Sequence, residues 1–229
     1  MDKNSFSIPR IDQLDNLFER NEDEFLSVLS SRTPRGSIHY HNWEEQFPHR
    51  FPNYPANQHV MFRMAVSRTQ LYVYWHMVSD GLKATHNKDL EPVAQDNCME
   101  IFLQVPGNDE YWNFEVNALG ALNASHRVER SNPTRLTHEQ LKSVGRTGSH
   151  VNSEPFTTHN DTVWWVALAI PLNLIGLDGD NLPEYIKGNL YACAGGIERP
   201  YYISCFPINT PKPDFHRPEF FGKIYLPHE

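Results

Sequence analysis

The chain has 229 residues, of which 12% are aromatic and 21% charged, and its formal net charge is −8. This composition is typical of a globular domain, and the acidic balance argues against a nucleic-acid partner, which would need a basic face. No apolar run approaches the roughly 20 residues that cross a bilayer, so no membrane partner is expected. The N-terminal MDKNSFSIPR lacks the apolar core of a signal peptide, which predicts a cytoplasmic protein if Met1 is the native start.

The three cysteines, Cys98, Cys193 and Cys205, all lie in apolar or strand-like runs. An odd number without C-x-x-C spacing argues against both a disulfide framework and a zinc site. We interpret them as buried free thiols and predict no cofactor.

The N-terminal quarter of the chain carries helical spacing of apolar residues over 11–31, which Asn21 can divide into two pieces. The sequence Thr-Pro-Arg-Gly at 33–36 ends this pattern. A stretch of aromatic residues interleaved with prolines follows and is predicted to be an ordered loop. We therefore expect residues 1–57 to form a helical extension packed on a body of residues 58–229.

From residue 59 onward the pattern is that of short strands separated by turn residues. Apolar and polar residues alternate over 60–66 and 71–77, and 162–170 is rich in strand-forming residues. Thr137 and Gln140 have capping-box spacing and predict one short helix. The further strands are expected at 98–105, 111–118, 122–130, 189–194, 201–206 and 220–226. Many strands with few helices predict an all-β sandwich or jelly roll.

The strands at 98–105 and 111–118 organise the rest of the chain. On each, bulky apolar residues alternate with other residues, so that one set faces a core and the other faces away. The second set includes Glu100, Asn113, Glu115 and Asn117. Such a polar row can bind a polar ligand, but it can also be a solvated sheet face or a set of buried hydrogen bonds between strands.

Four motifs in order resemble family 9 carbohydrate-binding modules. The sequence D-N-C-M-E-I-F from Asp96 is similar to the family's D-S-C-V-E-F-F, and Y-W-N-F-E-V-N-A-L-G from Tyr111 is similar to Y-Y-N-F-E-F-N-x-x-G. N-L-Y-A-C from Asn189 resembles N-F-Y-K-C. P-I at Pro207 and P-D-F-H-R-P-E-F-F-G from Pro213 resemble the family's C-terminal motif.

The resemblance implies a jelly-roll sandwich of the DOMON-like kind and a non-catalytic domain that binds an oligosaccharide or polysaccharide. In the best-known relatives two tryptophans enclose the terminal sugar, and carboxylate, amide and arginine groups bind its hydroxyls. Here Ala94 and Cys205 lie where stacking aromatics are expected, and Glu115 replaces an arginine. Trp75 and Trp112 are predicted in the core, which leaves Trp43 and Phe206 as candidate replacements. The candidate ligand-binding residues are Glu100, Glu115, Asn117, Asn113, Trp43 and Phe206.

Other functional interpretations remain open at this point. A protein-interaction or scaffold domain could keep the fold without the sugar, and the missing stacking residues favour that alternative. No G-x-S-x-G, H-E-x-x-H or phosphate-binding loop is present. Paired carboxylates such as Glu100 and Glu115 leave glycoside hydrolysis as a distant alternative.

Three further motifs are given structural interpretations. Asp214 and His216 share one side of an extended segment that we interpret as a clamp closing the sandwich. The D-G-D-N sequence at 178–181 is interpreted as a polar turn, although the resemblance makes a structural calcium conceivable. His39 and His41 could share a face, but no third metal ligand accompanies them.

Overall fold

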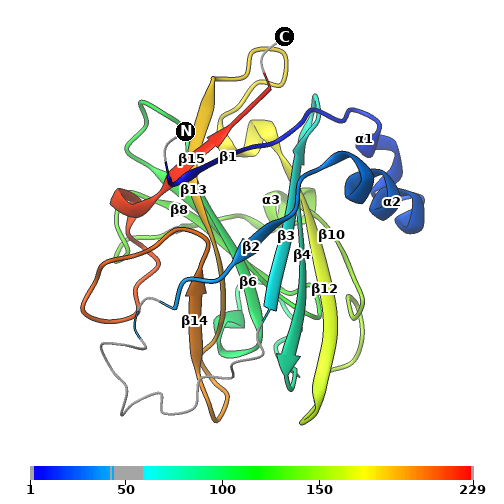
Figure 1. The fold of residues 1–229 in the computed structure, drawn as a ribbon, viewed down its shortest axis with the longest axis vertical. Helices are drawn as coiled ribbons and strands as arrows, with labels where there is room; N and C mark the ends of the chain where they lie inside the picture. The colour runs from blue at the N-terminus through cyan, green and yellow to red at the C-terminus, as the bar shows by residue number, and fades with distance from the viewer. Residues whose placement is uncertain (1–2, 42, 44–58, 228–229) are drawn as a thin grey trace.

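The computed structural model describes residues 3–41, 43 and 59–227, which form two β-sheets packed face to face (Figure 1). The larger sheet has the order β1-β15-β13-β6-β7-β8-β9, and β14 pairs with β13. The smaller sheet has the order β10-β12-β4-β3-β2. This arrangement confirms the predicted all-β class with N-terminal helices and one short inserted helix.

The bounds of the strands in the larger sheet are β1 Ser5–Ser7, β15 Gly222–Tyr225, β13 Tyr185–Ala194, β6 Cys98–Gln104, β7 Tyr111–Asn117, β8 Leu122–Arg127, β9 Thr134–Arg135 and β14 Tyr201–Ser204. Those of the smaller sheet are β10 Gly145–Gly148, β12 Asp161–Pro171, β4 Gln70–Asp80, β3 His59–Val66 and β2 Gly36–Ile38. β5 (Lys83–Ala84) pairs with β11 (Phe156–Thr157) in a separate two-stranded ladder.

The main hydrophobic core lies between the two sheets and is built by the two-residue period of the strands. Met99, Ile101 and Leu103 of β6 point into it, as do the alternate residues of β7. Trp75 is fully buried there and Trp112 is 8% exposed, in agreement with the position predicted for both.

The outer face of the larger sheet is buried as well, which the sequence did not predict. A second cluster on this face joins Cys98, Phe102, Tyr191 and Cys193 to Phe215 of the C-terminal segment. Residues 207–221 therefore cover the polar row of β6 and β7, and the row is not a solvated surface.

The N-terminal helices pack on the outer face of the smaller sheet (Figure 1). α1 spans Leu14–Leu17 and α2 spans Glu22–Arg32, and the side chain of Asn21 caps α2 by accepting from the Glu24 amide. The segment also adds β1 to the larger sheet and β2 to the smaller one, which helical spacing could not reveal. The predicted boundary at residue 57 lies outside the described residues.

The remaining helical elements are short. α3 (His138–Ser143) begins with the capping box predicted at Thr137 and Gln140. The 3-10 turns are η1 Val93–Gln95, η2 Leu172–Ile175 and η3 Pro218–Phe220.

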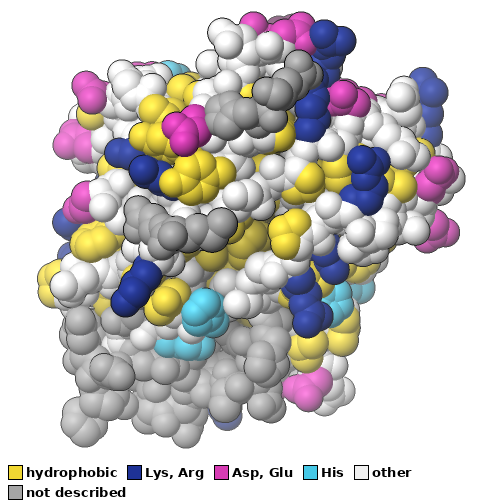
Figure 2. Space-filling view, turned by 45° about the horizontal axis from the view of Figure 1, so that its top comes forward, with side chains coloured by type: hydrophobic (Ala, Val, Ile, Leu, Met, Phe, Trp, Pro, Cys, Tyr) yellow, Lys and Arg dark blue, Asp and Glu magenta, His cyan; other side chains and the backbone are white. Residues whose placement is uncertain are grey.

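The surface mixes basic, acidic and apolar side chains on the face drawn in Figure 2. In the D-G-D-N loop, Asp180 forms an ion pair with Arg68. Within the described residues, no helix has the length and apolar character needed to cross a membrane.

Candidate functional site

A cavity of about 250 Å³ lies on the outer face of the larger sheet, between the strands and the C-terminal segment. Its floor is formed by residues of β6, β7 and β13, and one wall is formed by residues 213–216. The lining residues are Ala94, Glu100, Glu115, Arg130, Cys193, Tyr202, Pro213, Asp214, Phe215 and His216.

Glu100 and Glu115 form the acidic part of the floor. They are directly opposite each other in the antiparallel ladder of β6 and β7, and both are buried, with 3% and 7% exposure. Two adjacent carboxylates in a buried site resist simultaneous ionisation. Burial raises the pKa of both groups, and the neighbouring Cys193 and Glu115 raise that of Glu100 further, well above its ordinary value.

The hydrogen bonds of the two carboxyl groups differ, and this difference decides which of them is ionised. Glu115 accepts from the amide groups of Asn113 at 2.8 Å and Asn123 at 2.9 Å, which favour its charged form. Within the part of the chain that the structure describes, Glu100 accepts only from the thiol of Cys193, at 3.1 Å. We therefore infer that the pair holds one proton at neutral pH, with Glu100 protonated and Glu115 negatively charged.

A polar chain extends from Glu115 along β7 and β8. Asn113 donates to Glu115 and its carbonyl oxygen accepts from Ser125 at 2.7 Å. Ser125 in turn accepts from Arg127, which also donates to the backbone oxygen of Arg130. Asn113 is a fully buried member of this hydrogen-bonded chain, so the structure gives it a supporting position next to Glu115.

The wall formed by residues 213–216 carries an ion pair and a neutral imidazole. Arg130 donates to Asp214 at 2.9 Å, and Asp214 accepts from the backbone amide of His216. Burial, with the nearby Arg127 and Arg130, lowers the pKa of His216 to about 3. His216 is thus uncharged at neutral pH and contacts the Tyr111 hydroxyl at 3.1 Å.

Aromatic rings complete the wall. Phe215 stacks on Tyr191 with a centroid distance of 4.1 Å and an interplanar angle of 13°. Tyr202 lies 6.2 Å from Phe215 and is half-buried at the cavity. The cavity therefore combines aromatic surface with hydrogen-bonding groups.

Asn117 does not reach this cavity. Its amide donates to the His86 carbonyl at 2.7 Å and to Asp96 at 2.9 Å, while its oxygen accepts from the backbone amides of Leu119 and Ala121. All of its hydrogen-bonding capacity is used inside the protein.

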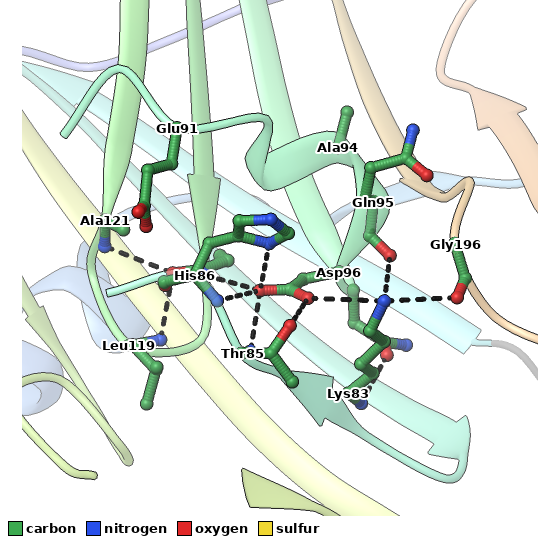
Figure 3. A network of polar contacts seen from close by, with 12 residues as sticks. Lys83, Thr85, His86, Glu91, Ala94, Gln95, Asp96, Leu119, Ala121 and Gly196 are labelled. Carbon is green, nitrogen blue, oxygen red and sulfur yellow. Dashed lines mark hydrogen bonds and ion pairs between the residues drawn. The ribbon is translucent and has the colours of Figure 1, made fainter. Parts of the chain in front are cut away.

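The Asp96 network holds the turn that carries Ala94 against β5 (Figure 3). The buried carboxylate accepts from the Thr85 amide and hydroxyl and from the His86 amide, each at 2.8 Å. Burial alone would raise the pKa of Asp96, but these bonds outweigh it and lower the pKa. Lys83 donates to the carbonyls of Gln95 and Gly196 beside the same turn.

Neither aromatic residue proposed to replace the stacking tryptophans lines the cavity. Phe206 belongs to the main core, where its ring stacks on Phe6. Trp43 is 3% exposed, donates to the Thr210 carbonyl at 3.1 Å and packs behind Phe215. The structure therefore does not bring either ring to this cavity, and both rings are used for packing.

The residues that sequence analysis missed come from the C-terminal part of the chain and from the loop after β8. Arg130, Tyr202 and Phe215 line the cavity, and the segment of Asp214 and His216 forms its wall as well as closing the sandwich. The P-D-F-H-R-P motif was a signal for Phe215, whereas no motif pointed to Arg130 or Tyr202.

Both the sequence and the structure are similar to known carbohydrate-binding proteins. The model of carbohydrate-binding family 9 matches residues 31–226. No curated protein matches the sequence significantly. A candidate carbohydrate-binding protein from Bacteroides uniformis ATCC 8492 has a similar structure, with a TM-score of 0.85, 23% identity and coverage of 98% of this chain and 99% of the other.

Two structures of a family 9 carbohydrate-binding module from Caldicellulosiruptor kristjanssonii share the fold at lower similarity. The complex with cellotriose has a TM-score of 0.53 and 11% identity, with coverage of 97% and 93% of the two chains. The complex with glucose has a TM-score of 0.56 and 12% identity, with coverage of 98% and 96%.

Proposed function

The chain belongs to carbohydrate-binding family 9, and from this membership we propose that the cavity over Glu100 and Glu115 binds the terminal sugar of a glycan. As a member of the family it is a non-catalytic carbohydrate-binding domain. The observation that carries the proposal is the meeting of a carboxylate pair with the aromatic wall of Tyr202 and Phe215 in one cavity.

The size of the cavity supports recognition of an end. Its volume of about 250 Å³ is below the roughly 300–1,000 Å³ of sites for drug-sized ligands, so it suits a single ring better than several. A cleft for the middle of a chain would need to continue on both sides of that ring.

The chemistry of the walls suits a sugar. The charged Glu115 can accept from a hydroxyl group, while the protonated Glu100 can both donate and accept. Arg130 provides a charged donor. The C–H face of the ring would lie on Tyr202 or the edge of Phe215, where the apolar contact needs no polar partner.

The two alternatives fit the site less well. A scaffold that had lost sugar binding would lack aromatic surface near Glu100, yet Tyr202 and Phe215 line the same cavity. A glycosidase needs its two carboxylates on either side of the scissile bond. Glu100 and Glu115 lie side by side on one sheet face, and the family to which the chain belongs is non-catalytic.

Calorimetric titration with glucose, cello-oligosaccharides and xylo-oligosaccharides tests the proposal. Each sugar is paired with its borohydride-reduced form, which has lost the terminal ring at the reducing end. Binding of the intact sugar alone supports capture of that end. Equal binding of both forms points to another part of the glycan, and absence of heat with every sugar counts against the site for these glycans.

Substitutions test whether the glycan binds in the cavity. Tyr202→Ala should weaken binding by about tenfold, which corresponds to roughly 1.4 kcal/mol. Tyr74→Ala is the matched control, because Tyr74 is a half-buried tyrosine on the smaller sheet and lies outside the cavity. Equal loss in both variants would contradict the proposal.

A further inference from the structure

Three side chains with metal-ligating atoms meet at the floor of the cavity, which Glu100 and Cys193 line and beneath which Cys98 is fully buried. Cys98 and Glu100 project from the same face of β6 because they are two residues apart. Cys193 of β13 is directly opposite Cys98 in the antiparallel ladder. The two sulfur atoms and a carboxylate oxygen of Glu100 all lie within 4.8 Å of one another.

The hydrogen bonds within the protein satisfy these three side chains poorly. Glu100 is 3% exposed, and the partner of its carboxyl group is the Cys193 thiol, which is a weak donor. The Cys98 thiol lies 3.7 Å from the backbone oxygen of Met99, and its other partner is the Cys193 thiol, so both contacts are weak sulfur hydrogen bonds. Buried carboxylates normally have several strong partners, so the arrangement points to a ligand that supplies them.

We propose that Cys98, Cys193 and Glu100 bind one thiophilic divalent metal ion, with zinc as the best match. Two sulfur ligands and one carboxylate oxygen fit zinc, whereas calcium and magnesium require oxygen ligands. Because Glu100 and Cys193 line the cavity, a water molecule from the cavity would supply the fourth ligand. The three cysteines are buried free thiols, as the sequence predicted, but spacing could not show that the register of β6 and β13 brings together two that lie far apart in sequence.

The geometry requires only side-chain adjustment. Zinc–sulfur bonds of about 2.3 Å in a tetrahedron place the ligand atoms roughly 3.5–3.8 Å apart. The present separations of up to 4.8 Å therefore close by about 1.3 Å at most. Both strands belong to the rigid centre of the sheet, where β13 and β6 pair over seven residues.

The protons and charges balance. Ion binding displaces one proton from each thiol and one from Glu100, so three protons leave as the doubly charged ion enters. The resulting site carries a net charge of −1. Arg130 lines the same cavity and its charge acts on Glu100, which offsets the remaining negative charge.

Cobalt substitution tests the proposal in the reduced full-length chain. One equivalent of Co²⁺ should give the thiolate-to-cobalt charge-transfer band and the visible bands of a tetrahedral site, and one equivalent of Zn²⁺ should abolish them. The intensity of the charge-transfer band should correspond to two thiolates per ion. This measurement needs no variant, and absence of the band overturns the proposal.

The third cysteine provides a matched control. Cys205 is a buried free thiol near the main core and outside the three-residue group, so Cys205→Ser should keep the band. Cys193→Ser should halve the band and Cys98→Ser should do the same, while Glu100→Gln should weaken zinc binding at least tenfold. Retention of the full band in both Cys98→Ser and Cys193→Ser would overturn the assignment.

The metal site shares Glu100 with the proposed glycan site, but its test requires no glycan. Zinc should also raise the melting temperature of the unmodified chain, because it binds the folded state. Glycan titrations are performed on the metal-free chain, so the loss of either result leaves the other intact.

Discussion

Glu100 and Glu115 are direct cross-strand partners on the floor of one cavity, yet two amide groups donate to Glu115 whereas the Cys193 thiol donates to Glu100. Different hydrogen-bond donors thus give these two glutamate side chains different protonation states. One holds a charge and the other a proton, which gives a sugar both an acceptor and a donor on a single sheet face.

This asymmetry predicts different effects for the same substitution. Glu115→Gln replaces a charged acceptor and turns an amide donor toward Asn113 or Asn123, so it should destabilise the fold by about 1–3 kcal/mol. Glu100→Gln replaces a protonated acid with a neutral amide and should change stability by less than about 1 kcal/mol. Urea unfolding at pH 7 measures both values. A larger cost for Glu100→Gln would contradict the assignment of the proton.

Asn117 should stabilise the fold without contributing to ligand binding. Removing its amide in Asn117→Ala leaves the His86 carbonyl and the amides of Leu119 and Ala121 unpaired, at a cost of about 3–4 kcal/mol. The affinity of the folded protein for its glycan should remain within about twofold, because Asn117 does not line the cavity. Denaturation and calorimetry together check this, with the exposed Asn173→Ala as control. A large loss of affinity with little loss of stability would reverse the interpretation.

The strand alternation of β6 and β7 could be predicted because successive side chains must point to opposite faces. From the sequence alone, that rule places Trp112 in the core and Glu100, Asn113 and Glu115 on the other face, as the fold confirms. It could not show that this other face is buried, because alternation does not reveal what covers a sheet.

The remaining parts of the site depend on contacts between distant segments. Phe215 stacks on Tyr191, and Cys193 meets Cys98, through pairings that no local pattern encodes. Phe206 and Trp43 were selected because strand alternation placed Trp75 and Trp112 in the core, but both of the remaining rings also pack in hydrophobic clusters.

Asp96 should contribute both to the stability of the fold and to the affinity of the cavity for its glycan. Asp96→Asn places an amide group among the donors of Thr85, His86 and Asn117 and should cost about 2–4 kcal/mol. It should also weaken glycan binding severalfold, because the turn bearing Ala94 loses its anchor (Figure 3). The exposed Asp161→Asn serves as control, and calorimetry below the melting temperature provides the measurement. Unchanged affinity would show that the turn holds its position without Asp96.

His216 should make the fold sensitive to mild acid. Its pKa is about 3 in the folded state, because of burial and the charges of Arg127 and Arg130, against about 6.5 in the unfolded chain. The unfolded state therefore binds more protons in between, and the stability contributed by neutral His216 is lost as pH falls from about 6.5 toward 3. At pH 4.5 this loss amounts to roughly 2 kcal/mol relative to pH 7.

Urea unfolding of the parent and of His216→Gln at both pH values isolates that contribution. The difference in free energy of unfolding between pH 7 and pH 4.5 should be smaller in His216→Gln, which has no imidazole to protonate. The exposed His159→Gln should retain the dependence of the parent. An identical dependence in His216→Gln would mean that His216 takes up its proton as readily in the folded state as in the unfolded chain, and the cavity wall would then be cationic at pH 4.5.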